Sequence, residues 1–326
     1  MAFSICRKLP DTRVQSHVYA MCGKLAIAPY ACPGTQALGD SIAATFATGA
    51  DCVLLENHGI VVGGSDLRDA FQRFETLEFA AQTLIKAAAL GPARVLSPEA
   101  LAVHTMPVFG ELPARPPTNP EKELRGEICR FLHRAYQQRL LISTAGAFSC
   151  RLDEREFLIT PRRRDRLAVE PPGLVRVSGE GCAAGQQPSR AATLHARIYA
   201  RDPQIGAVIS AQPAYVSAFC VTDEPLNTHT IPESYLVLQE VPKLPFLRIV
   251  EDADRIASAI SLKKCPVVLI ANEAALVVGK TLLEAFDRLE VLEATAEAVL
   301  LARSVGPLAQ MPPSALEELR RVFGID

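Results

Sequence analysis

The stretch LLENHGIVVGG, residues 54–64, has a counterpart 215 positions later in the chain, LIANEAALVVG at residues 269–279. Shifting the chain by this offset aligns residues 51–92 with residues 266–307 without a gap, and 16 of the 42 aligned positions are identical. A single register that persists over this length indicates a repeated module rather than a chance match. The repeat therefore sets the expected organisation of the whole chain.

The repeated unit has the pattern of two strands followed by a helix. In the first copy, residues 52–55 and 60–62 are short apolar runs on either side of a tight turn. Apolar residues then recur at helical spacing over residues 67–85, and Ser65 or Asp66 can cap the helix that this spacing predicts. We expect the same three elements at the second copy.

A proline-rich segment separates the two copies. Seven prolines fall within residues 92–120, which predicts a linker or irregular chain that crosses a surface. We therefore expect a first module at residues 1–110, a linker at residues 111–120 and a second module at residues 121–326. The first residue of the chain aligns near Val216, so the first module is expected to lack its N-terminal half.

Composition narrows the class of partner. The formal net charge is −2, which gives no electrostatic basis for binding nucleic acid or an anionic membrane. No run approaches the ~18 uninterrupted apolar residues of a membrane span. The nine cysteines lack C-x-x-C spacing, which favours reduced thiols and a cytoplasmic protein over a disulfide framework or zinc finger.

Several short motifs, taken in order, resemble the class II aldolase/adducin family. The first module carries Asn57-His58-Gly59 followed by Gly64, with Pro33-Gly34-Thr35 upstream. The second module adds an ordered series: Gly146, Ser149, Thr160-Pro161, Pro188-Ser189, His195, Ile198-Tyr199, Pro203 and Val208. The resemblance implies an α/β fold, a three-layer α/β/α sandwich with a mixed, mainly antiparallel central sheet, here duplicated in tandem.

The resemblance also implies a chemistry. Catalytic members of the family are zinc enzymes in which an H-x-H pair and the histidine of an N-H-G turn hold the metal. A glutamate acts as acid and base, and two loops of the form G-N-x-S and T-P-S-G hold a substrate phosphate. The metal polarises a carbonyl and stabilises an enediolate while the carboxylate moves the proton.

Carried over residue by residue, this resemblance leaves no complete zinc site. His58 matches the third histidine and is the candidate metal ligand, but its counterpart in the second module is Glu273. The H-x-H pair falls on Ser210 and Gln212, and the catalytic glutamate falls on Ala191. One carboxylate without imidazoles does not make a zinc site, so zinc is a candidate cofactor that we do not expect in stoichiometric amount.

The segments that match the phosphate loops are also altered. The first reads Gly146-Ala147-Phe148-Ser149, and the second has Arg162 and Arg163 in place of a serine and a glycine. With Ser189, these arginines are candidates for binding a phosphate or carboxylate, since guanidinium forks suit both. The alternative is a solvated face or a set of interface ion pairs.

The remaining histidines and the acidic pairs have ordinary interpretations. From N-H-G alone, His58 is a turn residue, and only the resemblance favours a ligand position. His17 and His104 lie in irregular stretches and are expected at the surface. Glu78 and its counterpart Glu293 lie on the repeated helix, where packing and ion pairs are the expected roles.

Two functions of different class follow. The first is a catalytically impaired class II aldolase/adducin-like protein that serves as a binding or assembly module. The alternative is part of a zinc-dependent aldolase or epimerase, a carbon–carbon lyase for a small phosphorylated sugar, whose site is completed by an upstream segment or another subunit. We expect residues 1–91 to pack on the second module, to pair with another chain, or to be a truncated product. Two similar modules also suggest a homo-oligomer or a self-packed pseudo-dimer.

Overall fold

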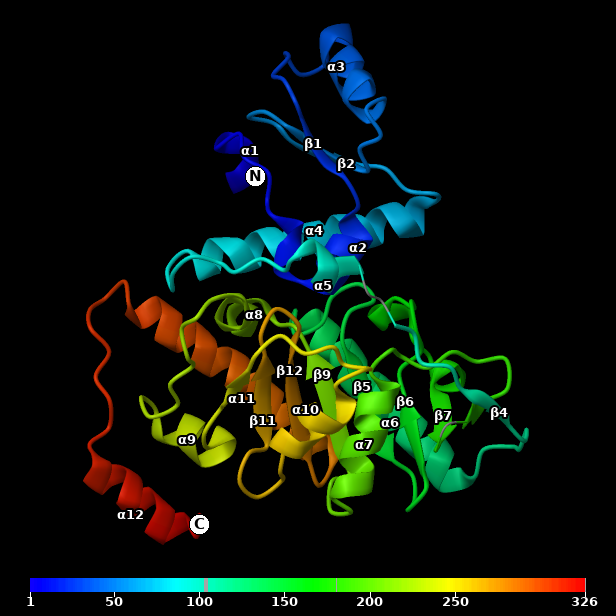
Figure 1. The fold of residues 1–326 in the computed structure, drawn as a ribbon, viewed down its shortest axis with the longest axis vertical. Coiled ribbons are helices and arrows are strands. Elements are labelled where there is room, and N and C mark those ends of the chain that lie inside the picture. Colours follow the sequence, from blue (N-terminus) through cyan, green and yellow to red (C-terminus); the bar gives the residue numbers. More distant parts are fainter. Residues whose placement is uncertain (103–104, 180, 326) are drawn as a thin grey trace.

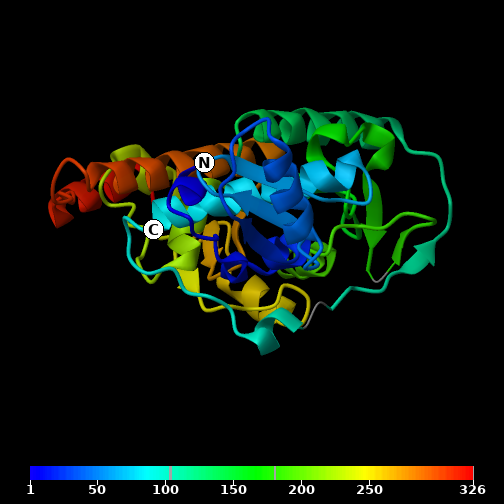
Figure 2. The same ribbon diagram turned by 90° about the horizontal axis from the view of Figure 1, so that it is seen from above.

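The computed structural model describes residues 1–102, 105–179 and 181–325. It contains two sheets, one of three strands and one of nine (Figure 1). The small sheet belongs to the N-terminal part of the chain and stands at one end of the molecule. The large sheet forms the body, with helices on both of its faces (Figures 1 and 2). No described helix has both the length and the apolar character needed to cross a bilayer.

The small sheet has the order β1-β2-β3, with β1 parallel to β2 and β2 antiparallel to β3. A turn at residues 56–58 joins β2 to β3. The N-terminal unit, which contains this sheet, consists of α1 (Ala2–Ile5), η1 (Thr12–Val14), α2 (Ser16–Cys22), β1 (Leu25–Ala28), α3 (Gln36–Phe46), β2 (Cys52–Leu55), β3 (Gly59–Val62) and α4 (Leu67–Ala87). The expected helix therefore forms, and Asp66 caps it by accepting the N–H of Asp69.

The large sheet has the order β10-β11-β12-β9-β5-β6-β7-β8-β4. The two end pairs, β10–β11 and β4–β8, are parallel, and the pairs between them are antiparallel. The strands are β4 (Gly110–Leu112), β5 (Ala147–Arg151), β6 (Glu156–Ile159), β7 (Val175–Ser178), β8 (Gly181–Ala183), β9 (Ala207–Ala211), β10 (Lys243–Leu244), β11 (Val267–Ile270) and β12 (Ala274–Gly279). The mixed, mainly antiparallel sheet is confirmed.

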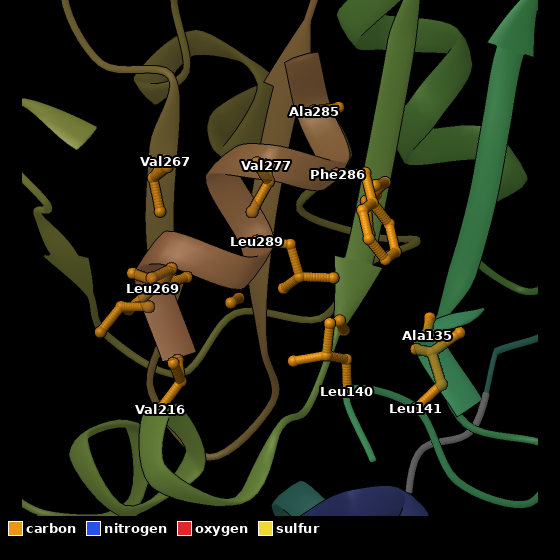
Figure 3. Close-up of a cluster of buried hydrophobic side chains, with 14 of the residues drawn as sticks. Ala135, Leu140, Leu141, Val216, Val267, Leu269, Val277, Ala285, Phe286 and Leu289 are labelled. Carbon is orange, nitrogen blue, oxygen red and sulfur yellow. The ribbon is translucent and has the colours of Figure 1, made fainter. Parts of the chain in front are cut away.

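Helices cover both faces of this sheet, so the three-layer α/β/α arrangement is confirmed. Successive residues of a strand point to opposite faces. Accordingly, Ile209 belongs to one buried cluster with α6 (Asn119–Gln137), α8 (Ala214–Val221) and α11 (Leu282–Ala302). Val208 belongs to the other, with α7 (Ala192–Arg201) and α10 (Ala253–Ala259). Figure 3 shows part of the first cluster, where α11 contributes Phe286 and Leu289.

The repeated sequence adopts the same local structure in both places. β10, β11 and β12 have the parallel and antiparallel pairing of β1, β2 and β3, and α11 follows as α4 does. Asn57 and Asn272 take the same left-handed conformation, with φ of 58° and 57°. At Gly64 and Gly279 the backbone of the following helix comes too close for a Cβ atom. The two copies of the repeated sequence therefore form the same arrangement of strands and helix.

The segment between the units is more ordered than the sequence suggests. Within residues 92–120, α5 (Pro98–Ala102) forms a short helix, and β4 joins the large sheet beside β8 as an edge strand. An edge strand forms backbone hydrogen bonds with a neighbour on one side only. A proline-rich segment, which has few backbone N–H donors, can therefore form an edge strand. The other elements are η2 (Arg166–Ala168), η3 (Pro171–Gly173), α9 (Pro232–Leu238) and α12 (Pro313–Phe323).

We expected residues 1–91 to pack on the second module, to pair with another chain, or to be a truncated product. In the structure they pack on the second unit. α4 lies against α8, and α8 also contacts α11, so one helix is shared between the two copies of the repeated helix (Figure 1). The side chain of Asn272 donates to the carbonyls of Val14 and Arg94, at 2.9 Å each. This contact fixes the turn before β12 to the segment that leads into α2.

Candidate functional site

His58 does not line the cavity that contains the other predicted site residues. It lies exposed on the turn between β2 and β3, where its backbone N–H donates to the hydroxyl of Ser4 at 3.0 Å. The neighbouring Asn57 accepts hydrogen bonds from Arg7. Over the described ranges, no group of three or more histidine, cysteine or acidic side chains could hold a metal ion. A metal role for His58 stays a prediction.

The other predicted site residues come together in one cavity of about 310 Å³. The counterparts of the family's metal and acid/base positions are all part of its lining: Ser210, Gln212, Glu273 and Ala191. The candidate anion-binding residues line the same cavity: Arg162, Arg163 and Ser189. Segments that are far apart in the sequence therefore meet at one end of β9 and β5.

Glu273 is buried and already has two partners. It accepts a hydrogen bond from Arg190 at 2.8 Å and another from the hydroxyl of Ser16 at 2.8 Å. Arg190 lies two residues before α7 and lines the cavity, whereas Ser16 begins α2 in the other unit. The carboxylate of Glu273, at a position where the resemblance predicts a histidine, therefore forms an ion pair and a hydrogen bond that join the two units.

His195 is a satisfied core histidine. One ring nitrogen lies 2.8 Å from the hydroxyl of Ser149 and the other 2.8 Å from that of Ser210. Ser149 also contacts the hydroxyl of Tyr199 at 2.8 Å. Burial lowers the pKa of His195 to about 3, so the imidazole is neutral at physiological pH. Ser210, at the first position where the resemblance predicts a histidine pair, therefore belongs to a buried hydrogen-bond chain.

The donor set at this position does not fit zinc. Ser210 is hydrogen-bonded to His195, and Glu273 to Arg190 and Ser16. Gln212 supplies an amide rather than an imidazole. Zinc sites in enzymes use about three histidine, cysteine or carboxylate ligands with an open position, which these side chains do not provide. We therefore derive no step through a metal at this cavity.

Arginines dominate one wall of the cavity. Arg162 and Arg163 follow Thr160-Pro161, and neither forms an ion pair with a carboxylate in the part of the chain that the structure describes. Burial and the nearby Arg163 and Arg190 lower the pKa of Arg162, because like charges disfavour its protonated form. Arg163 has a left-handed backbone with φ of 49°. A cluster of cations with this little neutralisation favours a bound anion.

A buried arginine holds the two loops of this wall together. Arg166 is almost fully buried, and its guanidinium donates to four carbonyls: those of Ala145, Gly146, Pro161 and Arg164. Burial lowers the pKa of Arg166 to about 10, which still leaves it protonated at pH 7. Gly146 has φ of 77°, and a Cβ there would lie 2.9 Å from the carbonyl oxygen of Ser210. The loop that replaces the G-N-x-S motif therefore needs its glycine.

One wall residue was missed by sequence reasoning. His17 was expected at the surface, but it lines the cavity from α2, and both of its ring nitrogens are buried. The surface prediction for His17 was wrong because tertiary packing of α2 on the second unit, which no local pattern encodes, covers the ring. His104 lies outside the described residues.

Comparison with known proteins agrees with the fold. A family model described as "Class II Aldolase and Adducin N-terminal domain" matches residues 1–85 and 126–300. The 3-oxo-tetronate 4-phosphate decarboxylase of Haemophilus influenzae is 29% identical over 185 residues, which are 54% of this chain and 85% of that protein. The L-fuculose phosphate aldolase of Methanococcus vannielii is 24% identical over 171 residues, 52% of this chain and 92% of that protein.

A solved structure extends the comparison. The crystal structure of YgbL from Escherichia coli aligns with a TM-score of 0.55 and 25% identity, over 61% of this chain and 99% of that one. The family match covers well over half of the chain, and the order of the sequence motifs and the sheet topology point the same way. The chain therefore belongs to the class II aldolase and adducin N-terminal domain family.

Proposed function

We propose that this protein binds a small phosphorylated sugar or sugar acid in the cavity of about 310 Å³ and acts on it as a carbon–carbon lyase. The observation that carries the proposal is the cluster of Arg162, Arg163 and Arg166 without a carboxylate partner of its own. The likeness to a sugar-acid phosphate decarboxylase and a sugar phosphate aldolase favours this function over a purely binding or assembly role.

Charge and backbone geometry suit a phosphate. Among the described residues, four guanidinium groups line the cavity and Glu273 supplies one carboxylate, which is paired with Arg190. Ser189 and Ala191 lie at the N-terminal end of α7, where backbone N–H groups and the helix dipole favour an anion. Guanidinium forks bind phosphate through two parallel hydrogen bonds. A dianionic substrate therefore finds charge and donors together.

The chemistry of the two relatives' substrates converges. Loss of carbon dioxide from a 3-oxo-tetronate 4-phosphate leaves the enediolate of dihydroxyacetone phosphate. Aldol cleavage of L-fuculose 1-phosphate leaves the same enediolate. The oxygen that gains negative charge in either reaction needs a fixed positive group, and preorganised donors in a desolvated cavity supply such stabilisation. We infer that the arginine wall fills this role here.

The first experiment measures binding of dihydroxyacetone phosphate and inorganic phosphate by calorimetry. Arg162→Ala is expected to weaken binding at least ~10-fold, since one charge-assisted hydrogen bond contributes about 1.5–3 kcal/mol. Arg130→Ala is the matched control, because Arg130 is exposed on α6 and away from the cavity. It is expected to bind as the wild type does. Absence of binding by the wild type would refute the proposal.

The second experiment tests catalysis and metal together. The purified protein is assayed for release of dihydroxyacetone phosphate from 3-oxo-tetronate 4-phosphate and from L-fuculose 1-phosphate, with and without chelator. Activity that survives chelation, with bound zinc well below one per chain, is the expected result. Binding without turnover of either substrate would instead support the binding-module function. Stoichiometric zinc that is lost in His58→Ala would contradict our expectation for the metal.

A further inference from the structure

α2 of the N-terminal unit forms one wall of the cavity. Its first residue, Ser16, is tied to Glu273 at 2.8 Å, and Asn272 holds the carbonyl of Val14 just before it. The next residue, His17, faces the cavity that Arg162 and Arg190 line from the second unit. The site is therefore built from both units, and the N-terminal unit supplies its imidazole.

The ring of His17 has no hydrogen-bond partner among the described residues. The residue as a whole is partly exposed, but both ring nitrogens are buried and neither makes a hydrogen bond to any described residue. The amide oxygen of Gln212, across the same cavity, is also buried without a partner. Buried polar atoms are normally satisfied, since leaving one unpaired costs about 1–3 kcal/mol. Two such groups in one cavity indicate a polar ligand that hydrogen-bonds to both.

The surroundings of His17 suit proton transfer. Burial and the charge of Arg190 lower its pKa to about 4, so the free protein holds a neutral imidazole at pH 7. A neutral imidazole has one nitrogen that can accept a proton and one that can donate. A bound phosphorylated substrate adds negative charge beside the ring, which raises its proton affinity. The ligand itself therefore brings the imidazole closer to the range where acid/base catalysis is efficient.

We propose that His17 is the acid/base of the site and moves the proton at the carbon next to the ketone of the bound substrate. The family's glutamate position is Ala191, whose side chain has no titratable group. Arg162, Arg163, Arg166 and Arg190 are cations, and Glu273 is engaged by Arg190 and Ser16. Among the described side chains that line the cavity, His17 is the neutral titratable group free to take up and release a proton.

The step balances without another reactant. A nitrogen of His17 takes the proton from the hydroxymethyl carbon of dihydroxyacetone phosphate, and the C–H electron pair forms the double bond of the enediolate. The carbonyl oxygen becomes the oxyanion that faces the arginine wall. The imidazolium then returns a proton to the same carbon and restores the ketone. In aldol cleavage, neutral His17 first takes the proton of the hydroxyl group on the carbon that becomes the aldehyde, the electron pair of the broken carbon–carbon bond forms the enediolate, and the imidazolium then protonates the enediolate carbon. In decarboxylation, the electron pair of the broken bond to the departing carbon dioxide forms the enediolate, and His17 passes to its carbon a proton taken from water.

The inference rests on the proposed function, and one experiment separates the two. Exchange of the hydroxymethyl proton of dihydroxyacetone phosphate for deuterium is followed by proton NMR in D₂O, beside calorimetric binding of the same compound. His17→Gln is expected to bind within about threefold of the wild type and to exchange at least ~100-fold more slowly, the usual scale of acid/base catalysis. His229→Gln, whose ring contacts Glu240 far from the cavity, is expected to exchange at the wild-type rate.

Each other result has a definite meaning. Wild-type exchange by His17→Gln overturns the role of His17 and leaves the proposed function standing. Binding of dihydroxyacetone phosphate by the wild type without proton exchange also overturns the role of His17 and leaves the proposed function standing. Loss of binding in His17→Gln also overturns it, because His17 would then hold the substrate rather than move its proton. Absence of binding by the wild type removes the proposed function and this inference with it.

Discussion

Glu293 makes the stability of the protein depend on pH. Its carboxylate accepts the N–H groups of Tyr215 and Val216, both at 2.9 Å, and so caps the first turn of α8. Burial nevertheless raises the pKa of Glu293 from 4.5 to about 7, and the two N–H groups only partly offset that effect. The folded protein therefore binds this proton more tightly than the unfolded chain does.

The sign and size of the effect follow from linkage. A group whose pKa is raised by folding contributes its stability fully below pH 4.5 and loses it as the pH rises through about 7. One pKa unit corresponds to about 1.36 kcal/mol, so the limiting loss is about 3.4 kcal/mol. Between pH 5 and pH 8 the expected loss is about 2.5 kcal/mol, because part of the titration lies below pH 5.

The assay compares urea unfolding of the wild type and Glu293→Gln at several pH values. Glutamine does not titrate, so the free energy of unfolding of the variant minus that of the wild type should rise by about 2.5 kcal/mol from pH 5 to pH 8. The repeat offers a matched control in Glu78, which occupies the same position of α4 but is exposed and paired with Arg139. The difference for Glu78→Gln should stay constant within about 0.5 kcal/mol. A constant difference for Glu293→Gln would refute the reasoning.

Two further substitutions test how the site is held. Asn272→Ala should destabilise the protein by about 2–4 kcal/mol in chemical denaturation, because it removes two hydrogen bonds to backbone carbonyls and puts alanine at positive φ. Asn57→Ala shares the backbone strain and removes only exposed hydrogen bonds from Arg7, so a loss as large as that of Asn272→Ala would contradict the assigned contacts. Arg166→Met should cost about 3–5 kcal/mol by leaving four carbonyls without their donor, whereas Arg130→Met should change stability by less than about 0.5 kcal/mol.

The sequence predicted what depends on local pattern. Strand and helix spacing at residues 51–92 and 266–307 located the same elements in both copies, and α4 and α11 begin 215 residues apart, at Leu67 and Leu282. The resemblance also brought together residues that share one cavity, such as Ser210 and Glu273. Spacing and motif order carry this information because they reflect burial on one face of a strand or helix.

What depends on contacts between distant segments was not predicted. His17 was assigned to the surface because seven residues of α2 have no pattern that reveals their partner. Its environment is created by Glu273 and Arg190, more than 170 positions away in the chain. β4 was likewise missed, since three residues in a proline-rich stretch give no strand signal of their own. Both errors come from tertiary packing that overrides local propensity.

Electrostatics offers a reason why the cavity suits an anionic substrate although its donor set does not fit zinc. In a zinc enzyme of this fold, the charge that attracts a phosphate and stabilises an enediolate oxygen comes largely from the metal. Here the described lining of the cavity has four arginines, Arg162, Arg163, Arg166 and Arg190, and one carboxylate, Glu273. These side chains together carry a net charge of about +3 at neutral pH. Ser210 and Gln212 offer no imidazole to a metal, and the guanidinium groups supply a positive field fixed by the backbone. On this view the substitutions at the metal positions and the arginines in the phosphate loops are one compensated change, so restoring the histidines alone, as in Ser210→His with Gln212→His, should not create zinc-dependent activity while the arginines and the Glu273 anchor remain.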